Sequence, residues 1–92
     1  MQVPAELKNM YLNRRIQDIT KIKTSLKTGD FGLAEKLGHQ VKGNAETFEF
    51  PEMASLGVAI EKAAIQKDPG LVMSLVDEME HAIIEAQGKL SH

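Results

Sequence analysis

The sequence contains no cysteine and no tryptophan, and only one of its 92 residues is a tyrosine. Without cysteine, the chain can form neither disulfide bonds nor thiolate metal sites, and it has no thiol nucleophile. With so few aromatic residues, stacking on nucleic acid bases is not available as a binding mechanism. These absences leave histidine, serine, lysine and the carboxylates as the residues that can carry chemistry.

The sequence also lacks a strong net charge and long apolar runs. Its formal net charge is −2, and its basic residues are scattered, with only Arg14 and Arg15 adjacent. We therefore expect neither nucleic acid nor a membrane surface as a partner. No apolar run approaches the ~20 residues of a membrane span, and the N-terminus does not resemble a signal peptide. The sequence predicts a cytoplasmic protein with a single domain over residues 1–92.

Apolar residues recur at helical spacing along four segments, and no strand-like alternation is present. The predicted helices run from about Ala5 to Lys27, from about Phe31 to Phe48, onward from Pro51, and from Pro69 to about Gln87, where Gly88 is the expected stop. The breaks between them are Gly29 with Asp30, Phe50 before Pro51, and Asp68 before Pro69. The prediction is an all-α fold, an antiparallel up-and-down four-helix bundle, with or without a short extra N-terminal helical piece.

The second predicted helix has an apolar stripe and a histidine that lies off it. The stripe consists of Ala34, Leu37, Gly38, Val41, Ala45 and Phe48. At 100° per residue, His39 lies roughly 140° from the centre of this stripe, on a solvent flank with Lys42. Gly43 follows one turn later, although glycine costs about 1 kcal/mol relative to alanine in a helix interior. We interpret Gly43 as leaving room for a large partner to reach the imidazole.

Two inward glycines, Gly38 and Gly57, lie on the second and third predicted helices. They would allow these helices to approach closely, or they are simply tolerated, and the sequence leaves both interpretations open.

The sequence offers too few ligands at suitable spacing to form a metal site. Glu78 and His81 form one Glu-x-x-His motif, which is only a quarter of a di-iron bundle site. Glu35 and His39 are one helical turn apart, but two ligands without a third make a weak site. His92, at the end of the chain, is expected to be disordered. We therefore expect no metal and no intrinsic cofactor.

The sequence shows no hydrolytic site either. His39 therefore remains as the candidate nucleophile. Ser25, Ser55 and Ser74 have no recognisable base held by a third group, and no glycine-rich phosphate loop is present. An exposed neutral imidazole is a competent nucleophile near pH 7. Lys42, three residues after His39, would place an ammonium beside the oxygens of an incoming phosphoryl group. The alternative interpretation of these residues is a surface histidine without function.

A longer pattern extends from this histidine. It reads His39-Gln40-Val41-Lys42-Gly43, followed by Phe48, Phe50-Pro51, Leu56-Gly57 and Ile60-Glu61. The pattern resembles the histidine-containing phosphotransfer (HPt) domain family, which carries His-x-apolar-Lys-Gly on the second long helix of a four-helix bundle. The resemblance covers nearly the whole chain in register.

The resemblance implies a phosphorelay intermediate without autonomous kinase or phosphatase activity. His39 would accept a phosphoryl group from a receiver-domain aspartate and pass it to another receiver, Lys42 would hold the phosphoryl oxygens, and Gly43 would give the partner steric room. Glu61 either accepts the Nδ1 hydrogen of the imidazole and leaves Nε2 as the nucleophile, or is a solvated glutamate. Glu49 stands where the family usually has glycine, which implies a change in local geometry or in partner preference.

The implied partners are receiver domains of response regulators and of hybrid histidine kinases, with Mg²⁺ supplied by the receiver. Two alternatives stay open at this point. The chain could be a helical adaptor that is never phosphorylated, with His39 incidental. It could also be a kinase dimerisation domain, which would form its bundle from two copies. Because a single chain supplies four helices, we expect a monomer.

Overall fold

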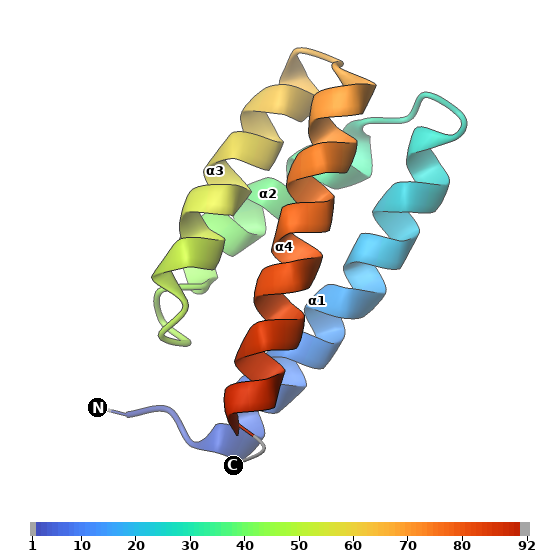
Figure 1. The fold of residues 1–92 in the computed structure, drawn as a ribbon. Coiled ribbons are helices and arrows are strands. Elements are labelled where there is room, and N and C mark those ends of the chain that lie inside the picture. Colours follow the sequence, from blue (N-terminus) through green and yellow to red (C-terminus); the bar gives the residue numbers. More distant parts are fainter. Residues whose placement is uncertain (1, 91–92) are drawn as a thin grey trace.

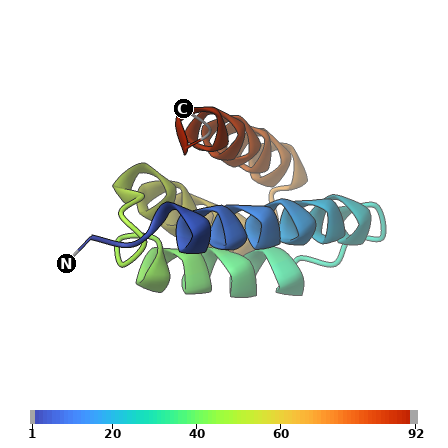
Figure 2. The ribbon, with the colours of Figure 1, turned by 90° about the horizontal axis from the view of Figure 1, so that it is seen from below.

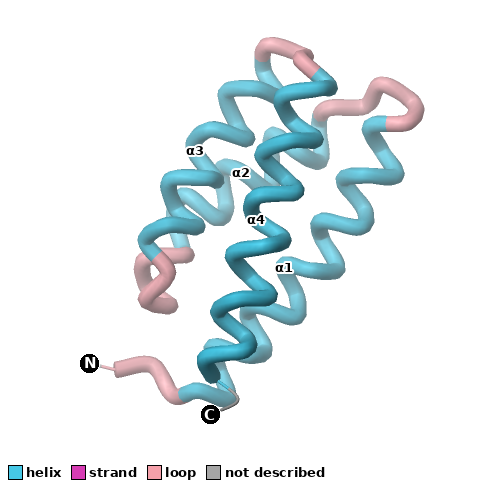
Figure 3. The backbone as a smooth tube through the Cα atoms, viewed as in Figure 1, coloured by secondary structure: helices cyan, strands magenta, loops and turns pink. Residues whose placement is uncertain are grey.

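The computed structural model describes residues 2–90, which form four α-helices joined by short turns (Figures 1 and 3). The helices are α1 (Ala5–Leu26), α2 (Gly32–Asn44), α3 (Pro51–Ile65) and α4 (Pro69–Leu90). The described residues contain no strand, and the predicted all-α four-helix bundle is confirmed. Over this range α1 is one continuous helix, so the optional extra piece at the N-terminus is not present as a separate element. No helix in residues 2–90 has the length and apolar character needed to cross a membrane.

Each helix packs against the next one in the chain, and α4 returns to contact α1. Seen from below, α2 and α4 lie on opposite sides of the bundle (Figure 2). The most extensive contact is between α2 and α3. This order of neighbours is the up-and-down arrangement that short connections favour.

The core consists of aliphatic side chains from all four helices. Its largest fully buried members are Leu12, Ile19 and Ile22 of α1, Val41 of α2, Met53 and Ile60 of α3, and Val72, Val76, Met79 and Ile83 of α4. These positions follow the apolar stripes predicted from three- and four-residue spacing. Fully burying one such side chain contributes about 1.5–3 kcal/mol, so these stripes supply a large favourable contribution to folding.

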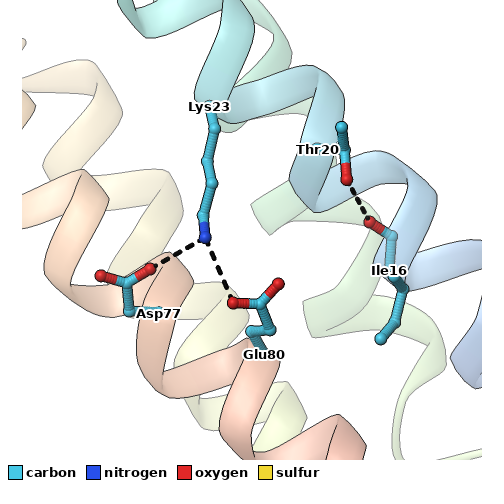
Figure 4. A network of polar contacts seen from close by, with 5 residues as sticks. All are labelled: Ile16, Thr20, Lys23, Asp77 and Glu80. Carbon is cyan, nitrogen blue, oxygen red and sulfur yellow. Dashed lines mark hydrogen bonds and ion pairs between the residues drawn. The ribbon is translucent and has the colours of Figure 1, made fainter.

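Charged side chains join α1 to α4 outside the core. Lys23 Nζ lies 3.1 Å from an Asp77 oxygen and 3.2 Å from a Glu80 oxygen, as Figure 4 shows. In the same view the Thr20 hydroxyl donates to the carbonyl oxygen of Ile16 within α1. One lysine of α1 thus pairs with two carboxylates of α4, and this partly exposed contact links the two helices.

The predicted turn residues occupy the expected places. Gly29 ends the first helical segment with a φ of +74°, in the left-handed region where glycine is favoured. The Asp30 carboxylate accepts a hydrogen bond from the Gly32 N–H at 2.9 Å, and the Asp68 carboxylate accepts one from the Leu71 N–H at 3.1 Å. Both aspartates thus satisfy amides at helix N-termini that have no partner within the helix.

The predicted end of the second helix at Phe48 is wrong, because α2 ends at Asn44. Phe48 and Phe50 both stack on Tyr11 of α1, with ring centroids 4.4 Å and 6.1 Å from the tyrosine ring. In a continued helix, residues two positions apart are rotated by about 200° from each other, so both rings could not face Tyr11. The chain therefore leaves the helix, and the Phe50 N–H donates to the carbonyl of Ala45 at 2.8 Å to close the turn.

The predicted end of the fourth helix is also wrong. The sequence predicts a stop at Gly88, but α4 continues through this residue to Leu90. Gly88 does not have the positive φ of a helix-ending glycine. Leu90 packs against the core, so its apolar contact favours continuation of the helix.

Candidate functional site

Helices α2 and α3 meet at a pair of glycines. A Cβ atom on Gly38 would lie 2.6 Å from the backbone nitrogen of Glu61, and one on Gly57 would lie 2.9 Å from the carbonyl oxygen of Gly38. Both distances are shorter than van der Waals contact, so a side chain at either position would force the helices apart. Of the two interpretations that the sequence left open, the structure therefore supports close packing. This packing brings the backbone of Glu61 against the turn of α2 that carries His39.

Alanine substitutions at Gly38 and Gly43 are expected to change stability in opposite directions. Gly38→Ala should lower the free energy of unfolding by about 1–3 kcal/mol, because its methyl group meets the backbone of α3. Gly43→Ala should raise it by up to ~1 kcal/mol, since nothing lies within 4 Å of a Cβ there and alanine is the better helix former. Urea unfolding of both variants measures the two effects. Equal changes in the two variants would contradict the close helix contact.

His39, Lys42 and Glu61 form a connected group on the surface between α2 and α3. The His39 Nδ1 atom lies 2.9 Å from Glu61 Oε2, and Lys42 Nζ lies 3.1 Å from Glu61 Oε1. The side chains of His39 and Lys42 are 68% and 42% exposed, whereas that of Glu61 is 18% exposed. The histidine is thus on the solvent flank, as its position in the helix predicted. A single carboxylate from α3 bonds both residues of α2.

The ionisation of Glu61 determines which nitrogen of the ring is available. The hydrogen bond from Lys42 lowers the pKa of Glu61, and the contact with His39 acts in the same direction, while partial burial opposes them. Glu61 is therefore an ionised carboxylate at neutral pH, and a carboxylate only accepts hydrogen bonds. Nδ1 of His39 must then donate its hydrogen to Glu61. In the neutral ring this leaves the lone pair on Nε2, the nitrogen on the far side from Glu61.

Gly43 leaves an open space one turn after His39. It is exposed, and apart from its two chain neighbours and the backbone of its own helix, no atom lies within 4 Å of the place where its Cβ would be. Its backbone is in the ordinary right-handed helical region, so neither turn geometry nor close packing explains a glycine here. What glycine provides here is a helix surface without a projecting side chain beside the exposed imidazole.

A family model described as the Hpt domain matches residues 6–89. The chain belongs to the Hpt domain family. Hpt domains are phosphotransfer modules of two-component signalling that interact with receiver domains and lack intrinsic kinase activity. The match confirms the family predicted from the pattern around His39. No curated protein and no solved structure shows significant similarity to the chain.

Glu49 is the residue that the family resemblance places where glycine is expected. Its φ is +69°, so this glutamate adopts the left-handed conformation that normally favours glycine. Its carboxylate lies 2.7 Å from Lys8 Nζ and accepts a hydrogen bond from the Val3 N–H at 3.3 Å. Lys8 and, secondly, Val3 lower the pKa of Glu49. These contacts offset the backbone strain, and they tie the turn after α2 to the N-terminal segment in a way that glycine could not.

A polar and aromatic cluster that the sequence analysis missed supports the C-terminal end of α2 in this Hpt domain. The Tyr11 hydroxyl donates a hydrogen bond to the Asn44 side chain, and the Arg15 guanidinium lies 5.0 Å from the centre of the Tyr11 ring. Burial is the main reason that the pKa of Tyr11 is raised. Tyr11 and Asn44 are far apart in sequence, so no local pattern could have linked them. Together they fix the turn of helix that carries Gly43.

The other candidates from the sequence do not join the site. His81 and Glu78 are both exposed on α4, and residues 2–90 contain no group of three or more side chains that could hold a metal ion. His92 lies outside the described residues. The Ser25 and Ser55 hydroxyls donate to backbone carbonyls of their own helices. Glu35 is exposed one turn before His39, on the same side of the helix.

Proposed function

We propose that this Hpt domain is a phosphorelay intermediate that carries the phosphoryl group on Nε2 of His39. The observation that carries the proposal is the contact between His39 Nδ1 and Glu61, because it leaves the lone pair of an exposed ring on Nε2. The donor is the aspartyl phosphate of one receiver domain, and the acceptor is the aspartate of another. The domain itself acts as a monomer and needs no metal, since Mg²⁺ belongs to the receiver.

The transfer step balances without any further reactant. The Nε2 lone pair attacks phosphorus in line with the aspartyl oxygen, so an N–P bond forms while the O–P bond breaks. The electron pair of that bond leaves with the aspartate as a carboxylate. The Nδ1 hydrogen stays on the ring, where Glu61 accepts its hydrogen bond, and this contact stabilises the positive charge that develops on the imidazole.

Lys42 and Gly43 serve the same step in different ways. Lys42 is exposed and lies one turn from His39, so its ammonium is within reach of oxygens on a phosphoryl group at Nε2. Gly43 has no side chain that would obstruct a receiver domain as it approaches His39. A receiver is a folded domain, so contact between its aspartate and the ring requires an unobstructed area around His39.

Labelling by a phosphorylated receiver domain tests the proposal. We expect a receiver that carries radioactive phosphate to label this protein within minutes in the presence of Mg²⁺, whereas ATP alone gives no label. The label should be lost in acid and stable in base, as a phosphorus–nitrogen bond requires. Binding to receivers without any transfer, across a panel of receiver domains, would instead support the helical adaptor.

Light scattering should give the mass of one chain, and a dimer would favour a kinase dimerisation domain.

A further inference from the structure

Lys42 is already engaged in the resting protein. Its Nζ lies 3.1 Å from Glu61 Oε1, while the other oxygen of the same carboxylate lies 2.9 Å from His39 Nδ1. Glu61 is the least exposed of the three side chains, and Lys42 carries its charge on a long flexible side chain, so Lys42 can adjust its position more readily than Glu61. The Lys42 ammonium, which is expected to bind the phosphoryl oxygens, is therefore held by the Glu61 carboxylate before the phosphoryl group arrives.

A phosphoryl group on Nε2 adds a second anion within reach of Lys42. The lysine ammonium is a compact charge with three hydrogens, and its position on the long side chain is adjustable. If the ammonium moves toward the phosphoryl oxygens, its distance from Glu61 increases. If it stays with Glu61, water solvates the phosphoryl oxygens instead. The phosphorylated state consequently gains less from Lys42 than it would if the lysine had no other partner.

We propose that Glu61 competes with the phosphoryl group for Lys42 and thereby favours onward transfer from His39 over storage of the group on it. This inference rests on the proposed function. In the onward step, an oxygen of the accepting aspartate forms a bond to phosphorus, the N–P bond breaks, and its electron pair returns to Nε2. The Nδ1 hydrogen remains on the ring, so His39 leaves as a neutral imidazole. Lys42 then returns to Glu61, which is a positioning residue in this scheme.

Glu61→Gln separates the two contacts of this carboxylate. The amide oxygen of glutamine still accepts the Nδ1 hydrogen, but a neutral amide no longer holds the ammonium of Lys42. At equilibrium with a purified receiver domain, we expect the ratio of phosphohistidine to phosphoaspartate to rise about two- to fivefold, the scale of one exposed ion pair. Glu35→Gln is the matched control, because Glu35 is an exposed carboxylate one turn from His39. It reports the general effect of removing one negative charge near the ring.

The same substitution in a Lys42→Met background decides whether Lys42 carries the effect. If the two anions compete for this lysine, Glu61→Gln should no longer raise the ratio of phosphohistidine to phosphoaspartate there, because without Lys42 the substitution only weakens the support of the positively charged ring. An undiminished shift in the Lys42→Met background would overturn the competition, as would the absence of any shift in the single variant. The absence of label on the wild-type protein with every receiver would remove the proposed function itself, and the inference with it. The two failures are thus distinguishable.

Discussion

His39→Gln is expected to abolish labelling by a phosphorylated receiver domain, with a fall of at least ~100-fold to the detection limit. Glutamine has a similar length and polarity, but the nitrogen of an amide has no lone pair available for attack on phosphorus. The exposed position of His39 means that the substitution should leave the fold unchanged. Transfer from a radioactive phosphoreceiver, followed on a gel, measures the loss, and circular dichroism confirms the helical content.

His81→Gln is the matched control for this prediction. His81 is also an exposed helical histidine, but it belongs to α4 and lines a groove between α3 and α4 with a volume of about 670 Å³. We expect this variant to be labelled like the wild type. Label that persists in His39→Gln and disappears in His81→Gln would place the phosphorylation site on α4 instead.

Gly43→Leu is expected to slow transfer from a receiver domain by about 10- to 100-fold. The leucine side chain would project from α2 beside the imidazole, where the wild-type surface is open, and would displace the approaching aspartate. A misplacement of about 1 Å is enough for a loss of roughly this size. The rate constant of transfer at saturating receiver concentration, measured by rapid quench, checks the prediction.

A small phosphodonor separates access from reactivity in the Gly43→Leu protein. Phosphoramidate needs no docking surface, so it should label His39 in this variant at close to the wild-type rate. A similar loss with phosphoramidate and with the receiver would show that the leucine disturbs the ring itself. In that case steric access would not be the role of Gly43.

The sequence predicts the fold well because periodicity is a local property. Residues three and four apart share a helix face, so most buried apolar positions of the four helices follow from spacing, whereas the buried Arg15 does not. The same rule places His39 on the solvent flank, since its angle to the stripe of α2 is fixed by the helix. The wrong helix ends have a different origin. The end of α2 depends on the stacking of Phe48 and Phe50 on Tyr11, a contact between distant parts of the chain.

The arrangement of the site was less predictable than its members. The contact between His39 and Glu61 joins residues from two helices, and it depends on how closely those helices pack at Gly38 and Gly57. No single helix pattern contains this information, so the sequence left two interpretations of Glu61 open. The bond between Lys42 and Glu61 does not follow from the sequence either, because it also joins residues of two different helices.

The position of Glu49 shows a further limit of sequence reasoning. The family resemblance implies glycine at this position, but the sequence does not show the consequence of a glutamate there. The structure keeps the left-handed backbone and uses the side chain to bind Lys8. Such compensation depends on the neighbouring segment in space, and its effect on the choice of receiver stays a prediction.

The nitrogen that carries the phosphoryl group tests the central claim most directly. Phosphorylated protein with ¹⁵N-labelled histidine can be examined by NMR, in which the coupling to phosphorus identifies the substituted ring nitrogen of His39. Because Glu61 Oε2 lies 2.9 Å from Nδ1 and holds its hydrogen, we predict phosphorus on Nε2 with the hydrogen still on Nδ1. Phosphorus bound to Nδ1 would contradict this account, since that nitrogen would first have to leave Glu61.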